Sequence, residues 1–188
     1  MAELKRAHEL DPLSLVINSI LGSTLATAGR NDEAIEQLRK TIEMDPTFDL
    51  THWFLGQAYE DKGQFAEAIA QYEKATQLSP DPAVLASLAR AYALAGRKEE
   101  ARKILDNLTT ESRRRYIPAY SLAVIYLSLG EKEEALRFLE KSYEDRAPFD
   151  TGVFGSLKID RRLDPLRGEP RFEALVRKVM SGAESETP

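Results

Sequence analysis

The sequence predicts an all-α protein, a right-handed superhelical solenoid built from helix–turn–helix repeats. Three residue types recur at a nearly constant spacing: prolines at Pro12, Pro46 and Pro80, glycines at Gly29, Gly63, Gly96 and Gly130, and alanines at Ala34, Ala68, Ala101 and Ala135. The glycine and alanine series share the same one-residue slip, so they follow one register. A period of about 34 residues is typical of stacked helix pairs.

The composition of the chain argues against several classes of binding partner and several kinds of chemistry. The chain has 188 residues, of which 43% are hydrophobic and 30% charged, an ordinary balance for a folded globular protein. Its net charge of −5 makes nucleic acids and anionic membranes poor partners. Cysteine is absent, which excludes disulfides, thiol nucleophiles and thiolate metal sites. No apolar run approaches the roughly 18 residues of a membrane span, so we expect no membrane insertion. We expect a cytoplasmic location, or a periplasmic one if the chain belongs to a membrane-anchored regulator.

The period divides a single predicted solenoid, residues 1–188, into repeats. The expected boundaries are 1–14 for a trailing half repeat, 15–48, 49–81, 82–115 and 116–148 for four full repeats, and 149–188 for a degenerate capping repeat and tail. In the half repeat, Leu4, Ala7 and Leu10 line one helix face, and Pro12 closes it. This pattern fits a second helix without its first, so we expect the chain to be an excised fragment of a longer protein.

The repeat at residues 49–81 explains why each of its helices forms. Two small and two aromatic residues make the expected helix crossing: Gly56, Ala68, Tyr59 and Tyr72. The small residues let the helices approach closely, and the rings fill the space beside the contact. Gly63 can take the positive φ that ends the first helix. Pro80 ends the second helix, because the residue before a proline disfavours the α region.

The last segment repeats the pattern imperfectly. Gly152 and Gly155 stand where a first helix should run, so we expect only a short helix at residues 150–158. A final helix should begin at Pro170, since proline is favoured in the first turn. Its apolar residues follow the helical period: Phe172, Leu175, Val176 and Val179. We expect this helix to cap the last full repeat near Leu136, Leu139 and Tyr143.

The repeat at residues 49–80 resembles the tetratricopeptide consensus. The matching positions are Leu55, Gly56, Tyr59, Gly63, Ala68, Tyr72, Ala75 and Pro80. The sequence departs at the first aromatic position, where His52 stands and Trp53 follows. Neighbouring repeats match less fully; Leu25, for example, occupies a position where tyrosine is usual.

The region from Arg113 onward is similar to a narrower group, the C-terminal tetratricopeptide arrays of large bacterial regulators. The similarity depends mainly on Leu157, Lys158, Asp160, Asp164, Pro165, Leu166, Arg167, Pro170, Arg171 and Phe172. Arg161 stands where those relatives usually carry proline. The resemblance implies that the chain is the interaction or sensing part of a bacterial signalling protein.

No catalytic or cofactor motif is present, so we predict that the chain is not an enzyme and has no cofactor and no metal site. We interpret His52, at an aromatic position of the repeat, as structural and His8 as solvated. The basic run Arg113, Arg114 and Arg115 is either a solvated connection between repeats or a contact for an acidic segment or phosphate.

The family resemblance implies that the first helices of the repeats line a concave groove. The predicted groove residues are Ile20, Leu50, Trp53, Phe54, Gln57, Arg90, Tyr120 and Val124. Relatives that clamp a terminal carboxylate use Lys, Asn and Arg, and here only Arg90 and Gln57 could serve. An aromatic, largely uncharged groove suits an apolar or amphipathic peptide. The alternative is that Trp53 and Phe54 pack as core against the next first helix.

The predicted function is therefore a non-catalytic scaffold that binds a protein partner through a peptide or helix segment in the groove. The alternative is a self-association module without a foreign ligand. In that case a homodimer would form through the groove or through the truncated N-terminal end.

Overall fold

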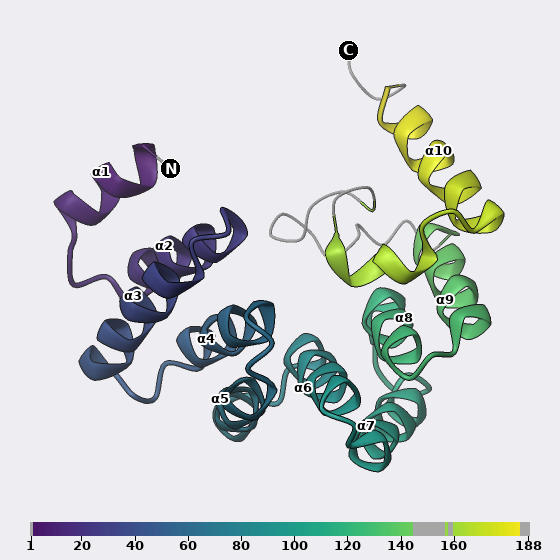
Figure 1. The fold of residues 1–188 in the computed structure, drawn as a ribbon, viewed down its shortest axis with the longest axis horizontal. Coiled ribbons are helices and arrows are strands. Elements are labelled where there is room, and N and C mark those ends of the chain that lie inside the picture. The colour runs from purple at the N-terminus through teal and green to yellow at the C-terminus, as the bar shows by residue number, and fades with distance from the viewer. Residues whose placement is uncertain (1, 145–156, 158–159, 185–188) are drawn as a thin grey trace. The chain divides into compact units, whose positions relative to one another are not determined.

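A computed structural model describes residues 2–144, 157 and 160–184. These residues form ten α-helices and one 3₁₀ helix, and they contain no strand (Figure 1). The all-α prediction is confirmed. The chain divides into two compact units, residues 1–97 and 98–188, which are described separately below. The prediction of one continuous solenoid stays a prediction.

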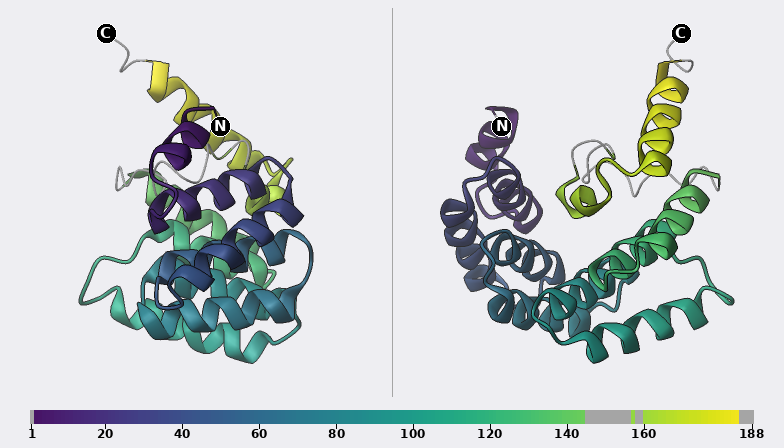
Figure 2. Two further views of the ribbon diagram at one scale, coloured as in Figure 1. Left: turned by 90° about the vertical axis from the view of Figure 1, so that its left-hand side faces the viewer. Right: turned by 45° about the vertical axis from the view of Figure 1, so that its right-hand side comes forward.

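The first unit contains six helices, and the last five of them form two rows. They are α1 (Ala2–Leu10), α2 (Leu15–Thr27), α3 (Asn31–Met44), α4 (Asp49–Asp61), α5 (Phe65–Leu78) and α6 (Pro82–Leu94). In one row α4 lies between α2 and α6, and in the other row α3 and α5 pack behind them (Figures 1 and 2). Each helix from α2 to α5 packs against the next one along the chain, as expected for consecutive helix–turn–helix repeats.

The turn between α4 and α5 shows how the repeat ends its first helix. Gly63 has φ 71°, in the left-handed region that favours glycine. The Gly63 N–H donates to the Glu60 carbonyl at 2.8 Å, and the Gln64 N–H donates to the Tyr59 carbonyl at 2.9 Å. These two bonds form a Schellman motif, which satisfies carbonyls that the helix end leaves without partners.

The crossing of α4 and α5 is packed without spare room. Tyr72 and Ala68 are fully buried, and Gly56 and Tyr59 are buried as well. A Cβ atom added to Gly56 would lie 2.5 Å from Cε1 of Tyr72. The burial of the predicted set and the contact of Gly56 with Tyr72 are confirmed, and the ring of Tyr72 requires glycine at this position.

His52, on α4, joins the loop before α4 to helix α5. Its Nε2 contacts the Pro46 carbonyl at 3.0 Å, and its Nδ1 contacts Oε1 of Gln71 on α5 at 2.8 Å. The side chain is buried, so both contacts are shielded from water. His52 therefore has the structural role that the sequence predicted.

The same arrangement occurs one repeat earlier with a different side chain. Nδ2 of Asn18 donates to the Pro12 carbonyl at 2.8 Å, and its Oδ1 accepts from Nε2 of Gln37 at 2.7 Å. Asn18 is also buried. In both repeats, these polar contacts join the carbonyl of a proline to the helix pair that follows it. They fix where the first helix of that pair begins.

The second unit contains α7 (Lys98–Glu111), α8 (Ala119–Ser128), α9 (Lys132–Glu144), the 3₁₀ helix η1 (Arg161–Leu166) and α10 (Pro170–Glu184). Its core joins residues of α8 and α9 to Leu157, Leu163 and Leu166 from the segment around η1. The predicted short helix at residues 150–158 falls outside the described residues, apart from Leu157.

The predicted C-terminal cap is confirmed in its start and in most of its contacts. Helix α10 begins at Pro170 and lies against α9 (Figure 2). Phe172 and Leu175 are buried in one core with Leu136 and Leu139. Tyr143 was expected in the same contact but is exposed, because it lies outside the apolar face of α9 that α10 covers.

Candidate functional site

The row of first helices in the first unit, α2, α4 and α6, is the candidate site and is called the first-helix face below. Hydrogen bonds join neighbouring helices along it. The buried hydroxyls of Ser19 on α2 and Thr51 on α4 lie 2.7 Å apart. Nε1 of Trp53 on α4 donates to Oγ of Ser87 on α6 at 3.0 Å. These side-chain bonds hold the three helices in register.

Trp53 is the most prominent side chain of this face. It is half-buried, and its ring stacks on that of Phe54 with centroids 5.6 Å apart and planes at 17°. Its partner Ser87 also donates to the Ala83 carbonyl at 3.0 Å. The indole is thus held at its N–H and against the ring of Phe54, while the side chain as a whole is only half-buried.

The two charged side chains that join α4 to α6 neutralise each other. Arg90 on α6 forms an ion pair with Glu60 on α4, and both side chains are largely buried. Glu60 also accepts a hydrogen bond from the Tyr72 hydroxyl at 3.3 Å. Because its guanidinium is already paired, Arg90 contributes a neutral pair to this face rather than a free cation.

The eight predicted groove residues differ in accessibility. Ile20 is exposed, and four residues are half-buried: Leu50, Trp53, Gln57 and Arg90. Three are buried: Phe54, Tyr120 and Val124. The burial of Phe54 agrees with the alternative that it packs as core.

Tyr120 and Val124 lie in the second unit, where the chain's own C-terminal segment covers them. Both belong to the core that contains Leu163 and Leu166 of η1. The Tyr120 hydroxyl donates to the carboxylate of Asp160, just before η1. This contact was not predicted, because the segment that supplies Asp160 no longer follows the repeat period.

Asp160 holds the start of η1 against α8. Its carboxylate accepts from the Arg162 backbone N–H at 3.0 Å and from Nη2 of Arg162 at 2.8 Å, in addition to the Tyr120 hydroxyl. Burial raises the pKa of Asp160, but the hydrogen bonds and charge of Arg162, with the bond from Tyr120, outweigh burial and hold the pKa below its ordinary value.

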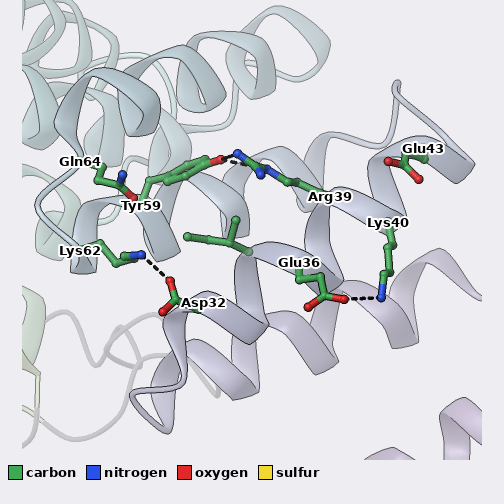
Figure 3. A pocket seen from close by; sticks show the side chains of 9 residues that line it. Asp32, Glu36, Arg39, Lys40, Glu43, Tyr59, Lys62 and Gln64 are labelled. Atoms are coloured by element: carbon green, nitrogen blue, oxygen red, sulfur yellow. Dashed lines mark hydrogen bonds and ion pairs between the residues drawn. The ribbon is translucent and has the colours of Figure 1, made fainter.

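A pocket of about 500 Å³ lies in the other row of the first unit, between α3 and the turn that joins α4 to α5 (Figure 3). Its lining is nearly all polar: Asp32, Ile35, Glu36, Arg39, Lys40, Glu43, Tyr59, Lys62 and Gln64. The Tyr59 hydroxyl accepts hydrogen bonds from Nε and Nη2 of Arg39 at 3.1 and 2.6 Å.

Most of the remaining charges in this pocket are paired within it. Lys62 bonds Asp32, and Lys40 bonds Glu36 at 2.6 Å (Figure 3). Sequence analysis did not predict the pocket. The charged residues of α3 follow a spacing of three or four, but this spacing is equally typical of an ordinary solvated helix face. The paired charges give the pocket no marked preference for one sign of ligand.

Within the part of the chain that the structure describes, no group of three or more His, Cys, Asp or Glu residues could hold a metal ion. In the same residues, no helix is both long and apolar enough to cross a membrane. In the basic run, Nε of Arg115 bonds Glu111 at 2.8 Å, and Arg113 and Arg114 are exposed.

Comparison with protein families identifies the repeat. Models described as tetratricopeptide repeat match residues 20–83, 59–117 and 119–147, and together they cover well over half of the chain. The chain belongs to the tetratricopeptide repeat family. Tetratricopeptide proteins bind protein partners and are typically scaffolds rather than enzymes, which supports a role in protein–protein interaction.

Solved tetratricopeptide structures agree with this fold. TTC0263, a thermophilic tetratricopeptide protein of Thermus thermophilus, is 25% identical, with 78% of this chain and 81% of that chain covered at a TM-score of 0.63. PilW, described as a widely conserved type IV pilus biogenesis factor, is 24% identical, with 76% and 67% covered at 0.57. MamA is 23% identical, with 76% and 84% covered at 0.53. The likeness to PilW and MamA concerns the fold alone. No curated protein sequence matches this chain.

Proposed function

We propose that this tetratricopeptide chain is a non-catalytic scaffold whose first-helix face binds an apolar or amphipathic peptide or helix of a protein partner. The observation that carries the proposal is Trp53. Its indole is fixed by Ser87 and Phe54 but remains partly accessible, between the half-buried side chains of Leu50 and Gln57.

The energetics of such a face favour an apolar segment. A ring that is already held in place loses little conformational entropy when a ligand covers it. Tryptophan is enriched among the few interface residues that carry most of the binding energy. The pairing of Arg90 with Glu60 means that a bound segment does not leave an isolated charge buried. No nucleic acid is expected as a partner, given the net charge of −5.

The single tryptophan makes the proposal directly testable, because the fluorescence of the chain's only Trp reports on Trp53 alone. Peptides would be selected from a random displayed library against the immobilised chain, and their binding would be titrated by fluorescence and calorimetry. We expect Trp53→Ala to weaken binding of the selected peptides by about 2 kcal/mol, roughly thirtyfold, with helix content unchanged.

Two control variants separate this site from others. Met44→Ala removes an exposed apolar side chain of α3, in the other row of helices, and it should leave affinity unchanged. Peptides that bind the Trp53→Ala chain as well as the wild type would contradict the proposal. Loss of binding only when Arg113, Arg114 and Arg115 are neutralised would move the site to the basic run. The larger regulator and the cytoplasmic location stay predictions.

A further inference from the structure

In the second unit a short segment of the chain lies on a first helix, at positions that are accessible in the first unit. Trp53 and Gln57 of α4 correspond, two repeats later, to Tyr120 and Val124 of α8. The two side chains of α4 are half-buried, whereas those of α8 are only 7% and 2% exposed. In α8 they belong to a core to which residues 160–166, called the covering segment below, contribute.

Three side chains of the covering segment determine how it fits α8. Leu163 and Leu166, three residues apart on η1, are fully buried in the core that contains Tyr120 and Val124. The guanidinium of Arg162 lies over the ring of Tyr120, with Cζ 5.3 Å from the ring centroid, where a cation–π interaction is favourable. The pattern is therefore an arginine followed directly by the first of two leucines three residues apart.

The acid of the covering segment has no equivalent task at Trp53. On α8 the hydroxyl of Tyr120 donates to Asp160 of the segment. On α4 the indole N–H already donates to Oγ of Ser87, within the first-helix face. Tryptophan is also the aromatic side chain that attracts cations most strongly. A ligand at Trp53 therefore needs the arginine and the leucines of the pattern but not the acid.

The charges of the first-helix face favour a basic ligand. Helix α2 carries no charged residue, and α4 carries three acids, Asp49, Glu60 and Asp61. Helix α6 carries one base, Arg90. Three acids against one base leave the three helices with a net charge of −2. This face attracts a basic segment and disfavours an acidic one.

We propose that the segment bound at Trp53 is a short helical turn with an arginine directly before the first of two leucines three residues apart. Because this proposal specifies the ligand of the same site, it rests on the proposed function. The arginine lies over the indole, and the leucines pack on Leu50 and Gln57. A second copy of the chain does not supply the segment, since its own Leu163 and Leu166 are fully buried in the second unit. The partner is a different protein.

The first test uses a peptide of this chain as the probe. The synthetic peptide LKIDRRLDPLR, residues 157–167, contains no aromatic residue, so tryptophan fluorescence during its titration reports on Trp53 of the full chain alone. We expect a saturable shift of the Trp53 emission and a matching isotherm by calorimetry. Trp53→Ala in the chain should weaken binding of this peptide about tenfold or more.

Variants of the peptide separate the ring contact from the effect of net charge. Arg162→Gln in the peptide should weaken binding about three- to tenfold, since it removes the cation over the ring. Arg161→Gln is the matched control: it removes the same charge at a residue that is exposed in the covering segment, and it should weaken binding less. Replacing both leucines of the pattern by alanine should weaken binding about tenfold or more.

Variants at Gln57 test the site without changing Trp53. The peptide has four bases and two acids, a net charge of +2. Gln57→Glu should therefore strengthen its binding, and Gln57→Lys should weaken it, by about two- to fivefold each. Gln77→Lys, at an exposed position of α5 in the other row, should leave binding unchanged. Circular dichroism would confirm that each variant folds, and the Gln57 pair decides the question if Trp53→Ala does not.

Three results would overturn the proposal. One is a Trp53 emission that the peptide does not change at any concentration. Another is binding that Trp53→Ala and the Gln57 variants leave unaltered, since the peptide would then lie elsewhere. The third is equal weakening by Arg161→Gln and Arg162→Gln. Library peptides that bind at Trp53 without an arginine before two leucines would support the scaffold role and contradict this ligand, whereas a library without any peptide that binds at Trp53 would contradict both.

Discussion

At the scale of single residues, His52 and Asn18 show one structural role performed by two kinds of side chain. They stand one repeat apart, both are buried, and each joins a proline carbonyl to a glutamine of the second helix. A buried polar group that loses its partner costs more free energy than the bond contributes when formed. An apolar residue at either position should therefore be more harmful than another polar one.

This reasoning gives a prediction for His52. We expect His52→Leu to lower the free energy of unfolding by about 1–3 kcal/mol, because the Pro46 carbonyl and Gln71 would both lose a partner. His52→Asn should recover much of the loss, since Asn18 makes the same pair of contacts. Urea unfolding followed by circular dichroism measures both. Equal losses for the two variants would mean that ring volume, rather than hydrogen bonding, matters at this position.

At the scale of helices, the sequence predicted where helices begin and end, because the repeat period determines these positions. Gly63 ends α4 with a positive φ, and Pro170 begins α10. Both predictions depend on local backbone chemistry, which a single residue type reveals. The position of Gly56 against Tyr72 was also predictable, because close helix crossings need small residues opposite large ones.

The candidate site was less predictable, because its contacts join residues that the period does not relate in a simple way. Which groove residues are accessible depends on packing between neighbouring helices, and Phe54 is buried where Trp53 beside it is not. The pairing of Arg90 with Glu60 needs the distance between α4 and α6. The bond from Tyr120 to Asp160 crosses 40 residues, many of them outside the regular repeats.

The close crossing of α4 and α5 predicts how a larger residue at Gly56 changes stability. Gly56→Ala should cost about 1–3 kcal/mol, although alanine is the better helix former by about 1 kcal/mol. The cause is the 2.5 Å approach of the new Cβ to the ring of Tyr72. The second unit carries Ala123 and Leu139 at the equivalent positions, both fully buried. Alanine therefore packs with leucine at the crossing of the second unit.

A double-mutant cycle would test this explanation. In the Gly56→Ala background, Tyr72→Leu should cost less than it does in the wild type, with a coupling of about 0.5–3 kcal/mol. Gly22, which meets Leu38 at the equivalent crossing, is the matched comparison for alanine against leucine. Strict additivity at Gly56 and Tyr72 would show that the ring is not the obstacle.

At the scale of the whole molecule, the two units differ in how their first-helix faces are covered. In the second unit the chain covers α8 with its own residues, and Tyr120 and Val124 are buried beneath η1. In the first unit the edge of α2 keeps Val16 and Ile20 exposed. Through its bonds to Tyr120 and Arg162, Asp160 holds the covering segment against α8.

The last prediction concerns how the contact between η1 and α8 depends on pH. The pKa of Asp160 is lower in the folded chain than in the unfolded one. The ionised carboxylate therefore contributes fully to stability above the unfolded pKa of about 3.9, and this contribution is lost as pH falls through the folded pKa. Asp160→Asn should therefore destabilise the second unit by about 1–3 kcal/mol near neutral pH. The difference from wild type should shrink as pH falls below about 4.

Asp164→Asn is the control for this measurement, because it removes an exposed carboxylate from the same segment. Asp164 pairs with Arg167 at 2.8 Å, and both side chains are open to solvent, so its loss should change stability by less than about 1 kcal/mol. Hydrogen exchange between pH 3 and 7 would follow the amides of α8, with those of α4 as the reference in the other unit. If Asp160→Asn opened α4 as much as α8, or by the same amount at every pH, the carboxylate would not be what fastens η1 to α8.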